Sequence, residues 1–233
     1  MLFDKKVIET CNAAMTLVVD YLKFSDDPTS EAAHNIIDKF FIQNNCESPE
    51  GHIVSSGLQT AEPHHQGSGL IQHGVPIVID IFPQSTETGY WADMTRTVCL
   101  GEPSDEIQNM YDTVLAAQQL AINNIRPGVK CRDLHTMVAD YFDSEGYKTG
   151  GQGKEFRYAY GFVHALGHGV NTEIHADPKI SVKSNDILQS GDVITIEPGL
   201  YYPEIGGIRI EDMLLVTADG CEILTNYPKD FII

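Results

Sequence analysis

The chain has 233 residues and a hydrophobic fraction of 42%, which suits one large globular domain or two small ones. It is strongly acidic, because 15 lysines and arginines stand against 33 aspartates and glutamates, for a net charge of −18 at pH 7. Such a surface repels phosphate groups, so we expect neither a nucleic-acid partner nor docking on an anionic membrane.

The five cysteines are odd in number and scattered, and none forms a Cys-x-x-Cys pair. Reduced thiols are therefore favoured over a disulfide framework. The first residues lack the pattern of a signal peptide, and no apolar run of about 18 residues predicts a transmembrane helix. These features predict a cytoplasmic protein.

Two helices are expected at the start of the chain. Apolar residues recur at helical spacing from Lys5 to Leu22. The segment 25–28 then interrupts the pattern with Ser-Asp-Asp-Pro. Thr29 is placed to cap a second helix, which is expected to end at Asn44.

A strand, a loop and a hairpin follow. Ile53 begins a short strand, and residues 63–74, which are rich in Gly, His and Gln, are expected to form a loop. The run 76–82 is apolar on both faces, which predicts a strand buried on both sides. Residues 83–89 connect it to residues 90–100, which are expected to return as its hairpin partner.

The second half begins with two more helices. Ser104 is placed to cap a helix that runs to Ala121. The next helix carries apolar positions from Leu134 to Tyr141, and Gly146 is expected to end it. A Gly-rich loop is expected at residues 150–153.

A second hairpin then closes the sequence. Residues 193–197 predict a strand, and residues 207–216 are expected to be its partner. The order helix, helix, strand, hairpin thus occurs twice, although the two halves share little sequence identity. We expect one α+β domain over residues 1–233, duplicated about a pseudo-twofold axis between residues of about 1–100 and about 101–233.

Four carboxylates and one histidine lie at matched places in this duplicated frame. Asp80 and Asp93 are 13 residues apart in the first hairpin, and Glu197 and Glu211 are 14 apart in the second. His168 lies between them in an expected Gly-His-Gly turn. A buried carboxylate is costly unless it is paired, hydrogen-bonded or bound to a metal. A single acid on a strand is more often structural, but four at matched positions are expected to converge.

Such an oxygen-rich set suits divalent ions such as Mn²⁺, Fe²⁺ or Co²⁺ better than it suits a structural zinc site of cysteine and histidine. The four carboxylates balance the charge of two divalent ions. Two ions about 3.5–4 Å apart can share a bridging water and hold an attacked carbonyl. The sequence therefore predicts a dinuclear centre equipped to hydrolyse an amide.

Four motifs, in order along nearly the whole chain, resemble the pita-bread metallopeptidases, a family that includes methionine aminopeptidase, aminopeptidase P and prolidase. They are Asp93-Met-Thr-Arg-Thr97, His164-Ala-Leu-Gly-His-Gly169, Ile196-Glu-Pro-Gly199 and Gly207-Ile-Arg-Ile-Glu-Asp212. The resemblance implies an α+β pita-bread fold with a dinuclear centre in its cleft. It implies that Asp80 binds one ion, that His168 and Glu197 bind the other, and that Asp93 and Glu211 bridge both.

The resemblance also implies roles for further histidines. His175 falls where the family contacts the scissile carbonyl, and His164 matches a histidine typical of the proline-directed branch. The substrate-contacting loop histidine is His64, with His65 as the near alternative. Each of these has the simpler interpretation of a surface or hydrogen-bonded histidine.

Two more roles concern proton transfer and ligand orientation. Glu197 is the candidate general base. Arg209, two residues before Glu211 on the same strand face, is expected to orient a metal-binding carboxylate. Its simpler interpretation is a surface ion pair.

The chain also departs from the family pattern. The usual Asp-x-Gly is here Asp80-Ile81-Phe82, Asn171 stands where glycine is common, and Ala176 follows His175 where an acid is usual. These departures leave every expected ligand in place and bear on the shape of the substrate pocket.

The expected activity is hydrolysis of the N-terminal bond of Xaa-Pro peptides with two divalent ions, for which Mn²⁺ is expected and Co²⁺, Fe²⁺ or Zn²⁺ are alternatives. The histidines favour the proline-directed branch. The chain begins almost at the catalytic domain, as methionine aminopeptidases do, and that activity is the alternative. A non-catalytic binding module on the same fold and a creatinase-like amidinohydrolase are further alternatives, and a homodimer is expected by resemblance only.

Overall fold

The computed structural model describes residues 2–149 and 160–233. The Gly-rich loop expected at residues 150–153 lies outside the described residues. Within them, no helix is both long enough and apolar enough to cross a membrane.

The helices of the first half begin and end close to where the sequence places them. Helix α1 spans Lys5–Phe24, and the Asp4 side chain accepts a hydrogen bond from the backbone N–H of Lys6. Helix α2 spans Ser30–Gln43, and Thr29 caps it by accepting from the N–H of Ala32 at 3.2 Å. Capping oxygens of this kind satisfy amides that the first helical turn leaves without partners.

The strands of the first half form an antiparallel sheet in the order β2-β3-β5. Every residue of β3 and β5 is buried, as the two-sided apolar run 76–82 predicts. The elements are β1 Cys46–Glu47, β2 Ile53–Ser56, the 3-10 helix η1 Gly57–Ala61, β3 Ile77–Ile81, β4 Gln84–Ser85 and β5 Met94–Val98.

The second half repeats two helices and a sheet. Helix α3 spans Asp105–Ile122 and is capped by the Ser104 side chain. Helix α4 spans Cys131–Ser144. Gly146 follows it with φ at +88°, the left-handed conformation that commonly ends a helix at glycine.

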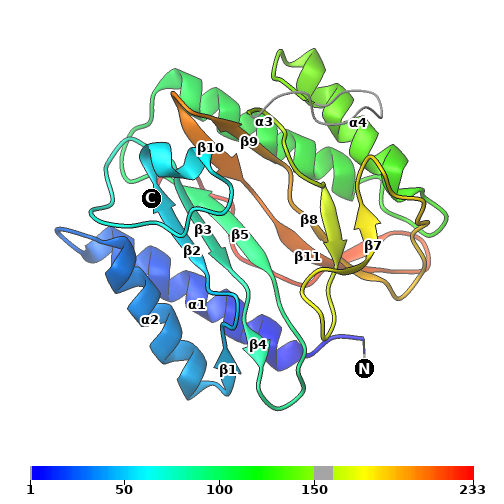
Figure 1. Cartoon of the computed structure of the whole chain (residues 1–233), viewed down its shortest axis with the longest axis horizontal. Helices are drawn as coiled ribbons and strands as arrows, with labels where there is room; N and C mark the ends of the chain where they lie inside the picture. The colour runs from blue at the N-terminus through cyan, green and yellow to red at the C-terminus, as the bar shows by residue number, and fades with distance from the viewer. Residues whose placement is uncertain (1, 150–159) are drawn as a thin grey trace.

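The sheet of the second half has the order β12-β11-β8-β6-β7. It contains β6 Gly167–Gly169, β7 Ala176–Ile180, β8 Val193–Ile196, β11 Asp212–Val216 and β12 Cys221–Ile223, and a separate ribbon pairs β9 Gly199–Tyr202 with β10 Gly206–Arg209. Figure 1 shows α1 and α2 on one side of the strands and α3 and α4 on the other.

The predicted strand 207–216 is in fact two strands with different partners. Its first part, β10, pairs with β9, and its second part, β11, pairs with β8. The break falls at Ile210 and Glu211. There the N–H of Glu211 bonds to the carbonyl of Thr95 in the first half, at 3.0 Å. The chain thus leaves one ladder for the other where the two halves meet.

The expected Gly-His-Gly turn was wrong, because residues 167–169 form strand β6. The glycines serve close backbone packing. A Cβ on Gly167 would lie 2.0 Å from the carbonyl oxygen of Thr195, and one on Gly169 would lie 2.2 Å from that of Asp177. No side chain fits at either place, so neighbouring strands approach His168 from both sides.

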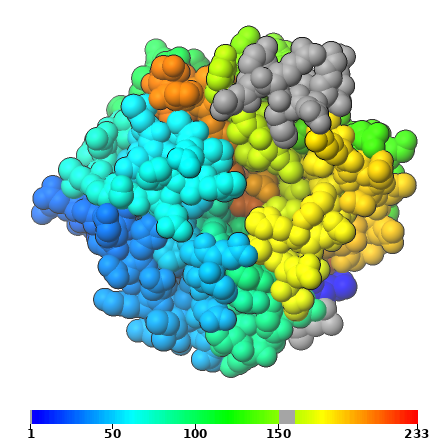
Figure 2. Space-filling model, viewed as in Figure 1, coloured from blue at the N-terminus to red at the C-terminus, as the bar shows by residue number. Residues whose placement is uncertain are grey.

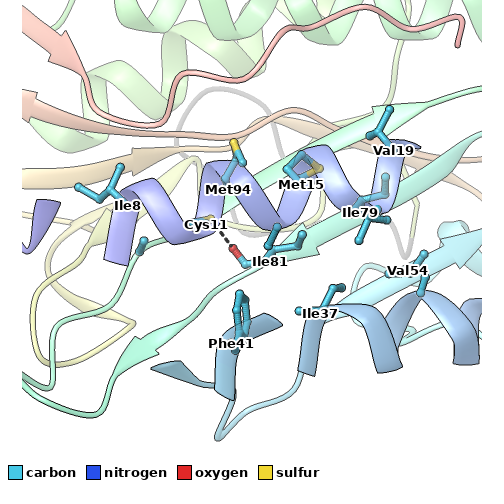
Figure 3. Close-up of a cluster of buried hydrophobic side chains, with 14 of the residues drawn as sticks. Ile8, Cys11, Met15, Val19, Ile37, Phe41, Val54, Ile79, Ile81 and Met94 are labelled. Carbon is cyan, nitrogen blue, oxygen red and sulfur yellow. Dashed lines mark hydrogen bonds between the residues drawn. The ribbon is translucent and has the colours of Figure 1, made fainter. Parts of the chain in front are cut away.

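Each half has its own hydrophobic core. Figure 3 shows the first, where α1 lies across β3 and the Cys11 thiol donates a hydrogen bond to the carbonyl of Ile81 at 3.2 Å. The second core joins α3 and α4 to the larger sheet and includes the stacked rings of Tyr111 and Phe231. The cores meet along β5, β10 and β11, and the predicted carboxylates lie at this junction.

Candidate active site

A cavity of about 510 Å³ opens between the two halves. In Figure 2 this face is hollowed between the cyan segment that follows β2 and the yellow segment that leads to β7. The cavity is lined by all five predicted metal-binding residues and by four further predicted site residues, Asp80, Asp93, His168, Glu197, Glu211, His64, His164, His175 and Arg209.

The first half places two aspartates from one antiparallel pair of strands. Asp80 lies on β3, and its register partner on β5 is Thr95. Asp93 directly precedes β5. Asp80 therefore faces the Thr95 position, and Asp93 reaches the cavity from the end of the neighbouring strand.

The second half places its acids where strands end. Glu197 directly follows β8 and Glu211 directly precedes β11, while His168 is the middle residue of β6. The Nε2 atom of His168 lies 3.2 Å from Oε1 of Glu197 and 3.7 Å from Oδ2 of Asp93. Ligand atoms of Asp93, His168 and Glu211 all lie within 4.8 Å of one another.

The hydrogen bonding of His168 shows what this cluster is built to hold. Its Nδ1 lies 3.1 Å from the carbonyl oxygen of Gly169, which can only accept, so Nδ1 carries the proton. On a neutral ring, the lone pair of Nε2 would face carboxylate oxygens, which are acceptors too; a proton or a cation at Nε2 removes this conflict. A backbone carbonyl behind one ring nitrogen is a common way to aim the other at a metal ion.

The charges in the cluster conflict without a cation. Burial and the neighbouring carboxylate of Glu211 raise the pKa of Asp93 well above its usual value. Burial and Glu197 do the same to the pKa of Glu211. Among the described residues, no group hydrogen-bonds the buried Oδ1 atom of Asp80. A buried oxygen-rich set of this kind fits divalent cations.

Glu197 differs from these two acids. Burial alone would raise its pKa, but a protonated His168, which donates from Nε2 to Glu197, lowers the pKa of Glu197 to about 2. It is therefore ionised at neutral pH and can accept a proton.

Arg209 connects Asp80 to the rest of the site. Its guanidinium donates to Oδ2 of Asp80 at 2.7 Å and to the hydroxyl of Tyr201 at 2.8 Å. It also donates to the carbonyl of Pro63 at 3.1 Å, directly before His64. Arg209 is only 4% exposed, so the simpler interpretation as a surface ion pair is wrong.

The structure places the expected histidines differently from one another. His64 lines the cavity, whereas Nδ1 of His65 accepts a hydrogen bond from the N–H of Gly67 in its own turn. His175 lies at the rim with its ring 4.5 Å from that of His168. Partial burial and His168 lower the pKa of His175.

His164 is held by both ring nitrogens. Nδ1 lies 2.7 Å from the carbonyl of Ala165, and Nε2 lies 2.9 Å from the hydroxyl of Tyr201. Because the carbonyl can only accept, Nδ1 donates to it and Nε2 accepts from Tyr201. Burial lowers the pKa of His164, so a neutral ring with this tautomer is favoured.

Sequence reasoning missed three residues of the site. The hydroxyl of Thr95 donates to Oε2 of Glu211 at 2.7 Å, and that of Thr195 donates to Oε1 of Glu197 at 3.3 Å. Tyr201 links Arg209 to His164. Thr195 and Tyr201 had a weak signal, since they lie two before and four after Glu197, but nothing local marks Thr95 as a partner of Glu211.

The comparisons with known proteins agree with this geometry. Residues 5–218 match the profile of metallopeptidase family M24. The chain belongs to this family. The Xaa-Pro dipeptidase of Pyrococcus furiosus is 36% identical over 191 residues, which are 81% of this chain and 51% of that protein.

Solved structures of this M24 family share the fold. The prolidase from Pyrococcus furiosus superimposes with a TM-score of 0.85 at 32% identity, covering 96% of this chain and 63% of the other. An X-Pro aminopeptidase from Thermotoga maritima gives 0.84 at 32% identity, covering 98% and 62%. The predicted α+β pita-bread fold is thereby confirmed. The chain spans about half the length of the curated relatives that it matches.

Proposed function

We propose that this protein is a metal-dependent exopeptidase that hydrolyses the bond between an N-terminal residue and a following proline. The observation that carries the proposal is the cluster around His168, in which a ring nitrogen and carboxylate oxygens, all acceptors, converge in a cavity open to solvent. The names of two relatives, an Xaa-Pro dipeptidase and an X-Pro aminopeptidase, support the substrate class.

The proposed ligands are the five residues named from the sequence. Asp80, Asp93, His168, Glu197 and Glu211 would hold two divalent ions, for which Mn²⁺ is the first choice because the donors are mostly carboxylates. When bound, such ions supply Lewis acidity toward a carbonyl and lower the pKa of water.

The side chains would divide the remaining work. Glu197 takes the proton of the attacking water at a carboxylate oxygen and passes it to the departing prolyl nitrogen. His175 and His64 face the cavity and would hydrogen-bond the substrate amide. His164, whose ring is fixed by Tyr201 and Ala165, would form a rigid part of the cavity wall against which the substrate lies. Arg209 holds Asp80 and the backbone just before His64 in fixed positions relative to each other.

The test is an assay of the protein stripped with chelator and reloaded with Mn²⁺ or Co²⁺. The substrates are Xaa-Pro dipeptides, Xaa-Pro-Yaa tripeptides and Met-Ala-Yaa tripeptides. Metal-dependent release of the first residue before proline is the expected result. Cleavage of Met-Ala peptides alone would identify a methionine aminopeptidase, and failure to bind any divalent ion near neutral pH would favour a non-catalytic binding module.

A matched pair of variants ties the activity to the cavity. Glu197→Gln removes the proposed base and a ligand with little change in volume. Asp143→Asn makes the same kind of change at an exposed position of α4. Only the first is expected to abolish turnover.

A further inference from the structure

One acidic residue at the cavity has no task in the proposed chemistry. Glu50 lines the cavity, and its charge is felt at His175. No ion pair among the described residues includes Glu50, and its side chain is exposed. The other four carboxylates of the cavity belong to the proposed metal centre.

The backbone fixes Glu50 at this rim. It sits in a tight turn in which the N–H of Gly51 bonds to the carbonyl of Ser48 at 3.1 Å, and Gly51 has φ at +85°. Only glycine adopts that conformation without strain. A Cβ on Gly51 would also lie 2.9 Å from the amide nitrogen of Gln66, so the turn packs closely against the loop opposite.

An apolar wall lies next to Glu50. Ile53 on β2 pairs with Asp80 on β3 in an antiparallel ladder, so Glu50 and Phe82 both lie just beyond that pair, at the same end of the two strands. Phe82 and Ile174 line the cavity and pack in the same hydrophobic cluster.

The charges near Glu50, Phe82 and Ile174 determine which substrate side chain this part of the cavity can bind. Among the described residues that line the cavity, Arg209 is the only arginine or lysine, and its guanidinium is already engaged by Asp80 and Tyr201. Lys179, whose charge also acts on His175, lies outside the lining and donates to the carbonyl of His175. An apolar wall that ends in a free carboxylate matches a side chain with an aliphatic stem and a cationic end. In an Xaa-Pro dipeptide only the first residue can carry such a side chain.

We propose that Glu50, Phe82 and Ile174 form a subsite that selects arginine or lysine as the first residue of the substrate. The proposal rests on the proposed Xaa-Pro peptidase function. Phe82 and Ile174 contact the methylene stem, and Glu50 pairs with the cationic end at the cavity rim.

The experiment compares substrates that differ only in charge. The dipeptides Arg-Pro and citrulline-Pro have nearly the same shape, as do Lys-Pro and norleucine-Pro. For wild-type metal-loaded enzyme, kcat/KM is expected to be about fivefold higher for the charged member of each pair, the size of an exposed ion pair. Glu50→Gln should bring the ratio to about one, and Glu50→Lys should reverse it.

Two further variants separate the subsite from other effects. Glu47→Gln removes an exposed charge from β1, outside the cavity lining. It should leave the ratio of kcat/KM between charged and uncharged dipeptides unchanged. Such a result would exclude the overall negative charge of the protein as the cause of the preference. Phe82→Ala should raise KM for Arg-Pro and citrulline-Pro alike while sparing Gly-Pro.

The outcomes are distinct. If the wild type hydrolyses Xaa-Pro dipeptides with equal kcat/KM for the charged and uncharged member of each pair, the proposed subsite is overturned and the proposed function stands. A Glu50→Gln variant that loses the same factor on all dipeptides would also overturn it, because Glu50 would then bind the substrate α-ammonium group. No hydrolysis of any Xaa-Pro dipeptide would overturn the proposed function and, with it, this subsite.

Discussion

The two halves of the molecule contribute different types of side chain to one cavity. The first half contributes two aspartates from a three-stranded sheet, one of them within a strand. The second half contributes two glutamates from beyond strand ends, together with His168 and two other histidines of the site. An aspartate within a strand reaches less far than a glutamate at a strand end. The acids thus take matched places in the two halves while the lengths of their side chains differ.

The halves are alike in that each orients the acids of the other. Thr95 of the first half donates to Glu211 of the second, and Arg209 of the second donates to Asp80 of the first. Behind them, Arg96 of the first half pairs with Asp212 of the second at 2.7 Å, with both side chains buried. Asp80 and Glu211 are thus each held by the other half, whereas Glu197 is held within its own half by Thr195.

The largest effect is expected from removing one charge in each half, with Asp93→Asn and Glu211→Gln. Each should lower kcat/KM by about a thousandfold or more, because a ligand of the metal centre is lost. Each should also stabilise the metal-free protein, because burial and neighbouring carboxylates disfavour the charge. Assays in saturating Mn²⁺ and urea unfolding after chelator treatment measure the two effects. A less stable metal-free variant would contradict this account of repulsion.

The buried pair across the halves should dominate stability. Asp212→Asn leaves the guanidinium of Arg96, which is 1% exposed, without its anion. The expected loss is about 3–5 kcal/mol in the free energy of unfolding. Lys5→Ala breaks an ion pair whose side chains are 83% and 64% exposed and should cost less than about 1 kcal/mol. Urea unfolding compares them, and equal losses would show that Arg96 does not join the halves.

A buried histidine in each half should make stability depend on pH. Burial lowers the pKa of His52 and of His135 to about 4, from 6.5 when unfolded. The unfolded chain therefore binds more protons between these pH values, so stability is present above pH 6.5 and is lost as the pH falls toward 4. Each histidine accounts for at most about 3 kcal/mol. His52→Leu and His135→Leu should each flatten the pH dependence of urea unfolding, and an unchanged slope would refute the assignment.

The smallest effects are expected at matched helix caps. Thr29→Ala removes the cap of α2 in the first half, and Ser104→Ala removes that of α3 in the second. Each should cost about 1 kcal/mol in the free energy of unfolding, because one amide of the first turn loses its partner. Thr16→Ala, at an exposed position inside α1, is the control that loses a hydroxyl without losing a cap. Thermal or urea unfolding detects the difference.

Local patterns predicted the helices well, because apolar spacing and capping residues such as Thr29 and Ser104 lie within a few residues of the structure they specify. The acids that line the cavity were singled out for a similar reason, since a charge inside an apolar run is a local anomaly. The order of elements followed from the two repeats of the pattern, whereas the pita-bread fold class came from the four motifs that resemble the family. The sequence predicted that Arg209 orients a metal-binding carboxylate, but it did not identify Asp80 as that carboxylate.

What local patterns missed depends on contacts between distant segments. The break of the strand at Glu211 is set by the backbone of Thr95, 116 residues away in the chain. The glycines around His168 resemble a turn in sequence, yet they serve neighbouring strands that press on both sides. The choice between His64 and His65 likewise depends on Arg209, which holds the carbonyl of Pro63.

The thiol of Cys11 gives the first half a built-in reporter. It is fully buried beneath the strand that carries Asp80, it donates to the carbonyl of Ile81, and burial raises its pKa well above the usual value. Thiolates react with alkylating agents and thiols do not. Cys11 is therefore expected not to be alkylated while the first half is folded. Cys131 is equally buried in the second half, where burial raises the pKa of its thiol to about 12. Pulsed alkylation followed by peptide mass mapping would therefore time the opening of the two halves separately, and matching rates at both sites would show that they open together.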